Sequence, residues 1–189
     1  MTIILTAVVL VLGLWLMFMF NGLVKLRNQV ANGFRQIDVQ LKRRHDLIPN
    51  LVNSVKGEMK FESTTLEKVI QARAAAINAG QTGNMNEILA KEGMLTQALG
   101  KLIALSENYP NLKSNESVKV LMEELTHTEN QIGFARQFYN DIATAFNIKQ
   151  QVVPNNMFAS MMGFTPAALF ELPADSPEKE TPKVDLTIG

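Results

Sequence analysis

Residues 3–20 read Ile3-Ile-Leu-Thr-Ala-Val-Val-Leu-Val-Leu-Gly-Leu-Trp-Leu-Met-Phe-Met-Phe20, and this stretch decides the fold. The uncharged region runs from Thr2 to Val24, and Lys25 is the first charged side chain. As a helix it is about 34 Å long, enough to cross a hydrocarbon core of about 30 Å with slight tilt. We therefore predict a transmembrane anchor over residues 1–24. Its membrane-spanning residues include Ile3, Leu10, Trp15 and Phe20.

A cleaved secretory signal is the alternative interpretation of this stretch. Such signals have a basic first region, an apolar core of about 7–15 residues and a small-residue cleavage site. Here no Lys or Arg precedes the apolar run, the run is longer, and Asn21-Gly22-Leu23 is a poor cleavage site. The chain has no Cys, which excludes lipid attachment through that residue. The sequence favours an anchor that is retained.

Basic residues directly after the apolar run predict its orientation. They are Lys25, Arg27, Arg35, Lys42, Arg43 and Arg44, against one acid, Asp38. The positive-inside rule keeps this side in the cytoplasm, which gives a single-pass topology, N-out and C-in, with a cytoplasmic body. Lys25, Arg27 and Arg35 are also candidates for contact with anionic lipid headgroups. The alternative is that these charges only determine topology.

The rest of the chain predicts an all-α protein in which the anchor continues into a long antiparallel helical bundle over residues 25–171. Apolar residues recur every three or four positions from Leu23 to Met59, and no segment alternates as a strand would. Pro49 lies within this stripe and predicts a bend rather than an end. The acidic, proline-containing segment 172–189 is predicted to be a disordered tail.

Further helices are predicted after the first one. An apolar face continues from Leu66 to about Asn78, and the segment Gly80–Gly83 is expected to break the chain. Asn84 is expected to start a helix over 85–105, and 109–113 is expected to be a turn. Ser114 or Asn115 should cap the last long helix, whose stripe ends near Phe146.

The segment from Val152 to Phe164 is too apolar for a free tail. We expect a short helix that folds back to cover the end of the bundle. The alternative is an exposed patch for a partner or for the membrane, because Met side chains suit adaptable interfaces. The residues of this candidate patch are Met157, Phe158, Met161, Met162 and Phe164.

Composition and motifs offer little support for catalysis or nucleic-acid binding. The 18 basic and 18 acidic residues balance, whereas nucleic-acid binding favours a basic excess. Without Cys there is no thiolate nucleophile, and the two His residues, His45 and His127, lie far apart in sequence. None of the phosphate-binding, zinc-protease or serine-hydrolase motifs occurs. We expect no enzymatic activity, no metal and no cofactor. An enzyme with a two-His site is the remaining alternative.

Charged residues within the apolar stripes predict a buried polar network. Arg44 interrupts the first stripe, and Thr128 and Glu129 occupy a turn of the last helix where apolar residues are expected. Arg136 lies on the same face as Glu129. A buried charge must be paired, so we expect Glu129 to meet Arg44, Arg43 or Arg73. The network then fixes the register of the helices; a buried sensing or ligand site is the alternative.

With these residues laid out, the chain resembles the LemA family over almost its whole length. The resemblance is most specific in Gln36-Ile-Asp-Val-Gln-Leu-Lys-Arg-Arg-His-Asp-Leu-Ile-Pro-Asn-Leu-Val52. It continues in several shorter motifs, which include Leu105-Ser-Glu-Asn-Tyr-Pro-Asn-Leu-Lys113, Thr128-Glu-Asn-Gln-Ile132, Ala135-Arg136, Tyr139-Asn140, Gly163-Phe164 and Pro182-Lys-Val-Asp185. Phe34 stands where the family usually has Trp, and Gly57–Glu62 replaces a segment that often ends in His-Glu.

The resemblance implies one N-terminal anchor, a long antiparallel bundle and no established enzymatic activity. The family also resembles one protein of the magnetosome membrane of magnetic bacteria. We therefore expect a bacterial cytoplasmic (inner) membrane, or an intracellular membrane derived from it, as the location. The expected role is a self-assembling scaffold or adaptor whose partners are lipid, further copies of the chain and unidentified proteins. The alternative is a sensor or remodeller of membrane curvature that uses the basic residues and the Met/Phe-rich segment.

Overall fold

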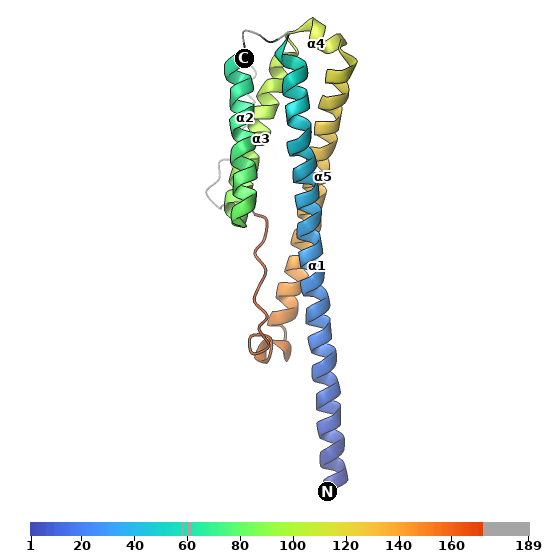
Figure 1. Cartoon of the computed structure of the whole chain (residues 1–189). Helices are drawn as coiled ribbons and strands as arrows, with labels where there is room; N and C mark the ends of the chain where they lie inside the picture. The colour runs from blue at the N-terminus through green and yellow to red at the C-terminus, as the bar shows by residue number, and fades with distance from the viewer. Residues whose placement is uncertain (58, 60–61, 172–189) are drawn as a thin grey trace, which may run out of the picture. The chain divides into compact units, whose positions relative to one another are not determined.

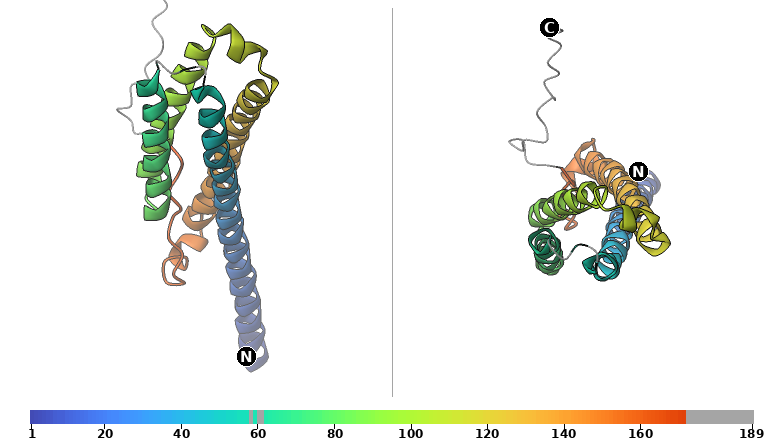
Figure 2. Two further views of the ribbon diagram at one scale, coloured as in Figure 1. Left: turned by 45° about the horizontal axis from the view of Figure 1, so that its top comes forward. Right: turned by 90° about the horizontal axis from the view of Figure 1, so that it is seen from above.

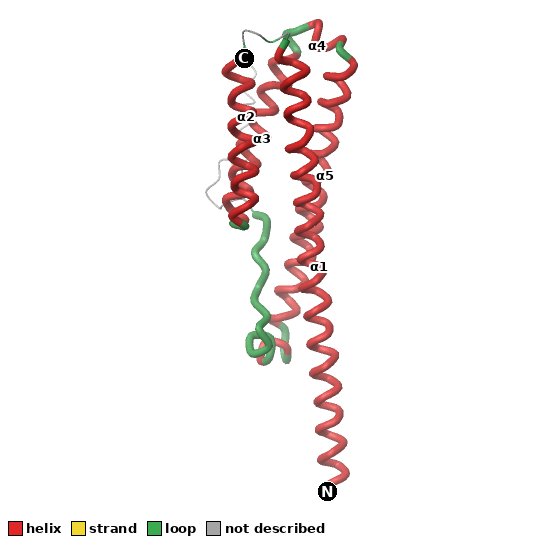
Figure 3. Tube along the Cα trace, viewed as in Figure 1, coloured by secondary structure: helices red, strands yellow, loops and turns green. Residues whose placement is uncertain are grey.

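The computed structural model describes residues 1–57, 59 and 62–171, and these are helical throughout except for turns and one extended C-terminal segment. Figure 3 shows this content, with no strand in the described part of the chain. The all-α prediction is thus confirmed. The predicted tail, 172–189, lies outside the described residues.

Helix α1, Thr2–Lys56, is the longest element and continues through Pro49, as predicted. Helix α5, Glu116–Gln151, is the second long helix. Asn115 precedes α5, and its side-chain oxygen accepts hydrogen bonds from the backbone N–H groups of Ser117 and Val118 at 3.1 and 3.3 Å. Of the two predicted caps, Asn115 therefore forms the cap, since it satisfies N–H groups that the helix leaves free.

Three helices follow α1 in the sequence and precede α5. They are α2, Ser63–Thr82, α3, Met85–Ser106, and the short α4, Pro110–Ser114. Two details differ from the sequence expectations. The break predicted over Gly80–Gly83 is confined to the end of that range, since α2 continues to Thr82 and ends where Gly83 adopts a φ of 69°. The expected turn around Pro110 is a single helical turn, because Pro suits the first position of a helix.

The chain forms two compact units, each with its own buried residues. The α1–α5 unit contains Met1–Leu47 and Leu121–Leu169, and the α2–α3 unit contains Ile48–Val120 together with Phe170. In the α2–α3 unit, α2 and α3 lie side by side, as Figure 2 also shows. Their connection is tight because the Asn84 side chain accepts from Asn86 and Glu87, as its predicted role as a helix start requires.

In the α1–α5 unit, the two long helices run along one another in antiparallel directions (Figure 1). Their buried stripes contain Leu23, Ile37 and Leu41 of α1 and Ile132, Tyr139 and Phe146 of α5. They approach most closely at Gly33, where an added Cβ would lie 3.4 Å from the Tyr139 Cα atom. Tyr139 of α5 therefore packs directly against the backbone of α1 at Gly33.

Candidate functional site at the anchor end of the α1–α5 unit

The first part of α1 is a helix without protein neighbours. Residues 2–14 are all exposed, and Ile3 and Leu10 are among them. An 18-residue window of α1 has a mean hydropathy of 2.8, and α1 is long and apolar enough to cross a membrane. Water is a poor solvent for such a surface, so exposed apolar area of this extent indicates lipid or another partner.

Contacts with the rest of the unit begin at Trp15. A cluster of buried side chains forms where the chain returns after α5, and it contains Met19, Leu23, Phe146, Ala159 and Phe164. The Trp15 and Phe158 rings meet edge to face at 6.1 Å between centroids, and the Phe20 and Phe164 rings do so at 5.7 Å. Edge-to-face contact between aromatic rings stabilises a fold in addition to the stabilisation from the apolar area that the rings bury. The anchor prediction placed Trp15 and Phe20 in the membrane.

We call residues 152–169 the return segment. Its helical part, among the described residues, is the 3₁₀ turn Asn155–Met157, so the expected short helix is present as a single 3₁₀ turn. The segment does fold back along the helices, as expected. Figure 1 shows it as the orange coil beside the end of α5.

Side chains of α5 hold the return segment in place. The Asn147 amide donates to the Ala167 carbonyl oxygen at 2.9 Å and accepts from the Ala167 N–H at 2.8 Å. The Tyr139 hydroxyl donates to the Ala168 carbonyl oxygen at 2.8 Å, and buried Asn155 donates to the Lys149 carbonyl oxygen at 2.8 Å. Sequence reasoning missed these residues. The available signal was a pair of polar side chains, Tyr139 and Asn147, two turns apart and adjacent to an apolar stripe.

The candidate patch of the return segment divides into two halves. Phe164 is buried, and Phe158 and Met162 are half-buried in the cluster with Leu23. Met157 and Met161 point outward, with 64% and 81% of their surface exposed. One side of the segment therefore covers the helices, as the covering role requires. The other side exposes methionines, as an exposed patch requires.

Basic side chains surround this cluster on both helices. Lys25 and Arg27 are exposed, and the Arg27 guanidinium lies 5.4 Å from the centre of the Phe164 ring. Lys149, which the sequence analysis did not single out, is exposed one turn beyond Phe146. Arg35 lies further along α1 and donates to Asn32 at 3.2 Å. Contact of Lys25, Arg27 and Arg35 with headgroups stays a prediction.

The predicted pairing of Glu129 with an arginine of the first helix is present. Arg44 is the largest fully buried side chain of the chain's described part, with 2% exposed, and its guanidinium lies 2.9 Å from the carboxylate of Glu129, whose own side chain is 38% exposed. Arg43 pairs with Glu124 beside it, but both of these side chains are well exposed. Exposed pairs contribute little, whereas a buried arginine depends on its partner. Thr128 is buried and donates to the Glu124 carbonyl oxygen at 2.7 Å.

The other predicted members of the network are Arg136 and Arg73. Arg136 is half-buried on α5, about two turns after Glu129, and Arg73 is half-buried on α2 in the other unit. A further buried acid, Glu92, lies on α3, and no feature of its sequence context had marked it. The role of these residues as a register-fixing network stays a prediction.

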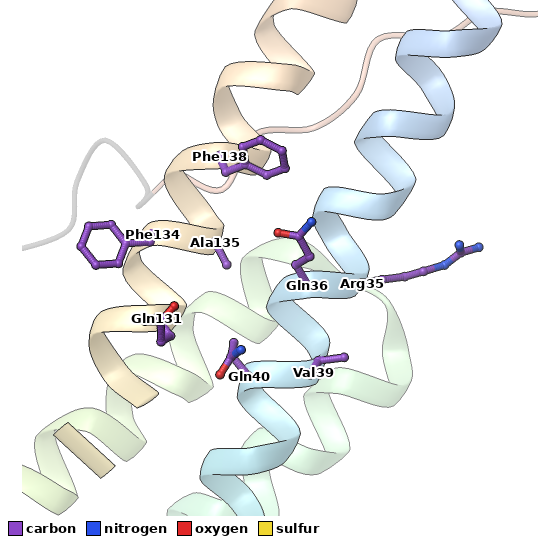
Figure 4. Close-up of a pocket in the computed structure, with 8 residues that line it drawn as sticks. All are labelled: Arg35, Gln36, Val39, Gln40, Gln131, Phe134, Ala135 and Phe138. Atoms are coloured by element: carbon purple, nitrogen blue, oxygen red, sulfur yellow. The ribbon is translucent and has the colours of Figure 1, made fainter. Parts of the chain in front are cut away.

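A groove of about 410 Å³ lies between α1 and α5 on the side of the α1–α5 unit (Figure 4). Its lining combines polar and apolar side chains: Arg35, Gln36, Val39, Gln40, Gln131, Phe134, Ala135 and Phe138. Phe134 and Val39 are 66% and 62% exposed. The Gln40 side-chain oxygen is buried and accepts no hydrogen bond from any residue that the structure describes. The lining contains no carboxylate, hydroxyl or imidazole side chain.

Nothing in the described residues gathers groups of the kind that hold metals: no three of His, Cys, Asp or Glu come together there. The titratable group with a shifted pKa in the α1–α5 unit is Tyr139, whose pKa burial raises. The Tyr139 hydroxyl donates its proton to the hydrogen bond with the Ala168 carbonyl oxygen, so this contact requires the neutral phenol.

These features define an all-helical protein whose first helix is a candidate membrane span and whose chain folds back onto the end of that span. A family model matches residues 33–186, described as the LemA family. The chain belongs to the LemA family.

Curated relatives cover most of the chain. Magnetosome protein MamQ 2 of Paramagnetospirillum magneticum is 25% identical over 190 residues, which is 88% of this chain and 69% of that protein. MamQ of Magnetospirillum gryphiswaldense is 23% identical over 193 residues, 89% of this chain and 71% of its own. Protein LemA of Metamycoplasma hominis is 26% identical over 151 residues, 80% of this chain and 68% of its own.

Proposed function

We propose that the chain is a non-enzymatic scaffold or adaptor, anchored in a bacterial membrane by α1 and assembling with further copies of itself. The observation that carries this proposal is the continuity of α1. The same helix supplies the apolar run and one of the two long helices of the packed body. A helix without an intervening linker holds the body at the bilayer surface, which suits a device that organises other molecules there.

The groove on the side of the α1–α5 unit supports self-assembly. Copies anchored through α1 share one orientation, so the same surface of two copies meets at the same height above the bilayer. Exposed Val39 and Phe134 offer apolar area, and the glutamine amides can both donate and accept. A two-fold interface places each surface against its own copy, where the glutamine amides of one copy can donate to those of the other.

The lack of Cys makes this proposal testable with single cysteines in the full chain. In phospholipid vesicles, we expect Phe138→Cys to form disulfide-linked dimers on oxidation. Val120→Cys, a position on α5 that is exposed to the same extent, is the control and should stay monomeric. Equal cross-linking at both positions, or light scattering of the detergent-purified protein that shows monomers alone, would contradict self-assembly.

The location is part of the proposal. Positive charges after the apolar run support an N-out, C-in arrangement. We propose the bacterial cytoplasmic membrane, or an intracellular membrane derived from it, as the location. Relatives named as magnetosome proteins support the second of these. Protease added to sealed cells, which should leave the body intact, tests the orientation.

A second function, the sensing or remodelling of membrane curvature, is favoured by the exposed Met157 and Met161 next to the apolar run. Apolar side chains that enter one leaflet bind more readily where lipid packing is loose. The full chain should then partition into small vesicles in preference to large ones of the same lipids. Equal density in both would leave the scaffold function standing and remove this one.

A further inference from the structure

We propose that the return segment is a second lipid-contacting element, immersed beside α1 at the boundary between hydrocarbon and headgroups. The ligand is the lipid bilayer, and its contact residues are Val153, Met157 and Met161. This inference rests on the proposed anchoring of α1. It adds that the body does not stop at the bilayer surface.

The depth of the segment follows from its aromatic contacts. The apolar run from Ile3 to Phe20 is about 27 Å long as a helix, close to the thickness of one hydrocarbon core of about 30 Å. Trp15 lies five residues before the end of that run at Phe20, and therefore about 7.5 Å inside its edge. Phe158 touches Trp15, and Phe164 touches Phe20. If α1 crosses the bilayer with its apolar run, these parts of the return segment lie at the same depth.

The outer side of the segment is uncharged and presents large apolar side chains alongside the polar Asn156, Ser160 and Thr165. Val153, Met157 and Met161 are 77%, 64% and 81% exposed. No charged residue occurs between Lys149 and Glu171, just as none occurs before Lys25. The groove of Figure 4, by contrast, mixes its exposed apolar residues with Arg35 and glutamines. A protein surface explains the groove better, and lipid explains the return segment better.

Part of the backbone of the segment has its polar groups satisfied within the protein. Non-helical backbone at membrane depth requires that its polar groups be satisfied within the protein. Here the N–H groups of residues 156–159 and 162–164 all donate to backbone carbonyl oxygens of residues 152–160. Asn147 satisfies the N–H and the carbonyl of Ala167, and Tyr139 satisfies the carbonyl of Ala168.

Basic residues mark where the headgroups lie. Lys25 and Arg27 follow the apolar run of α1, and Lys149 lies in the last turn of α5. All three are exposed around the cluster that joins Leu23, Phe146 and Phe164. Cations at this level suit anionic headgroups, while the residues beyond them in both chain segments are uncharged.

The test uses single-cysteine variants of the full chain in vesicles of phosphatidylethanolamine and phosphatidylglycerol. Each variant carries a fluorescent label, and a lipid-attached nitroxide quenches labels that touch acyl chains. Met157→Cys and Met161→Cys are the test positions, and Leu10→Cys reports the span itself. Val120→Cys is the control, because Val120 is 47% exposed on α5 and lies outside the groove of Figure 4. We expect loss of most of the fluorescence at positions 10, 157 and 161 and no loss at position 120.

The outcomes separate this inference from the proposed function. Quenching at position 10 but not at 157 and 161 would leave the anchor in place and overturn the lipid contact. No quenching at position 10 would overturn the anchor itself. Protection of positions 157 and 161 from a water-soluble thiol reagent in native membranes, without quenching in pure lipid vesicles, would assign the patch to a protein partner and also overturn the inference.

Discussion

The two ends of the α1–α5 helix pair are held together by different physics. At the anchor end, aromatic rings interlock and side-chain amides bind the backbone of the return segment, without a buried charge. At the far end, a fully buried arginine meets a carboxylate. Moving an ion pair away from water carries a desolvation penalty, and aromatic packing carries none. The difference is consistent with the proposal that the anchor end, and not the far end, lies at the bilayer.

The far end offers the largest effect. Glu129→Ala leaves the buried Arg44 without the Glu129 carboxylate, and we expect a loss of about 3 kcal/mol in the free energy of unfolding. Urea unfolding of the full chain in detergent, followed by circular dichroism, measures it. Glu124→Ala removes the exposed pair with Arg43 and should lose less than about 1 kcal/mol. Unchanged stability of Glu129→Ala would mean that the polar network does not support the fold.

The close approach in the middle of the pair connects the two ends. Gly33→Leu should lose about 2 kcal/mol, because the side chain meets the Tyr139 backbone and the helices must separate. Gly33→Ala is the control. Its added methyl group reaches ordinary contact distance, and alanine raises helix propensity by about 1 kcal/mol, so we expect little change. Thermal unfolding of both variants measures the difference, and equal stability of the two would contradict a close contact at Gly33.

The anchor end should respond to Asn147→Ala. The substitution leaves the N–H and the carbonyl of Ala167 without their partner, and we expect a loss of about 1–2 kcal/mol. Hydrogen exchange of residues 155–168 should rise, while exchange near Arg44 stays as it was. Trp15, the one tryptophan of the chain, touches Phe158 and reports the release of the segment through its emission. Faster exchange at both ends would show that the two ends unfold together, which would contradict their independent stabilisation.

The smallest effect concerns pH. Burial raises the pKa of Tyr139 in the folded chain above its ordinary value near 10. The contribution of the neutral phenol is therefore complete below about pH 10 and is lost as the pH rises through the folded pKa, since the unfolded chain releases the proton first. Tyr139→Phe should lose about 1 kcal/mol at neutral pH through its bond to Ala168. The difference between the two proteins should then shrink in alkaline buffer; a constant difference would contradict the shift.

Periodicity and capping explain why much of this architecture could be predicted. The 3–4 spacing of apolar residues predicted every long helix, and Asn84 and Asn115 marked two helix starts. The pairing of Glu129 with Arg44 followed from two charges in apolar registers. Helix periodicity and capping can be predicted because they depend on residues close together in the sequence. The ion pair can be predicted because a buried charge needs a partner.

The return segment could not be predicted to the same degree. Its path is determined by bonds from Tyr139 and Asn147 to backbone groups some twenty or more residues away, and a backbone carbonyl has no signature in the sequence. Composition predicted that residues 152–164 would cover something, and it left open which side chains turn inward. Burial of Phe164 and exposure of Met161 resolve that choice, and they depend on the tertiary path alone.

The unbroken length of α1 makes the body a lever. From Lys25 to Leu47 the helix measures about 33 Å, and a change of tilt by about 20° moves its far end sideways by about 11 Å. Tilt is how a helix adapts to bilayer thickness, so a thinner or thicker membrane would be converted into displacement of the far end. A joint at the membrane surface would absorb that movement; a rigid stem transmits it. With α1 anchored as proposed, the same helix would also couple the protein mechanically to the lipid.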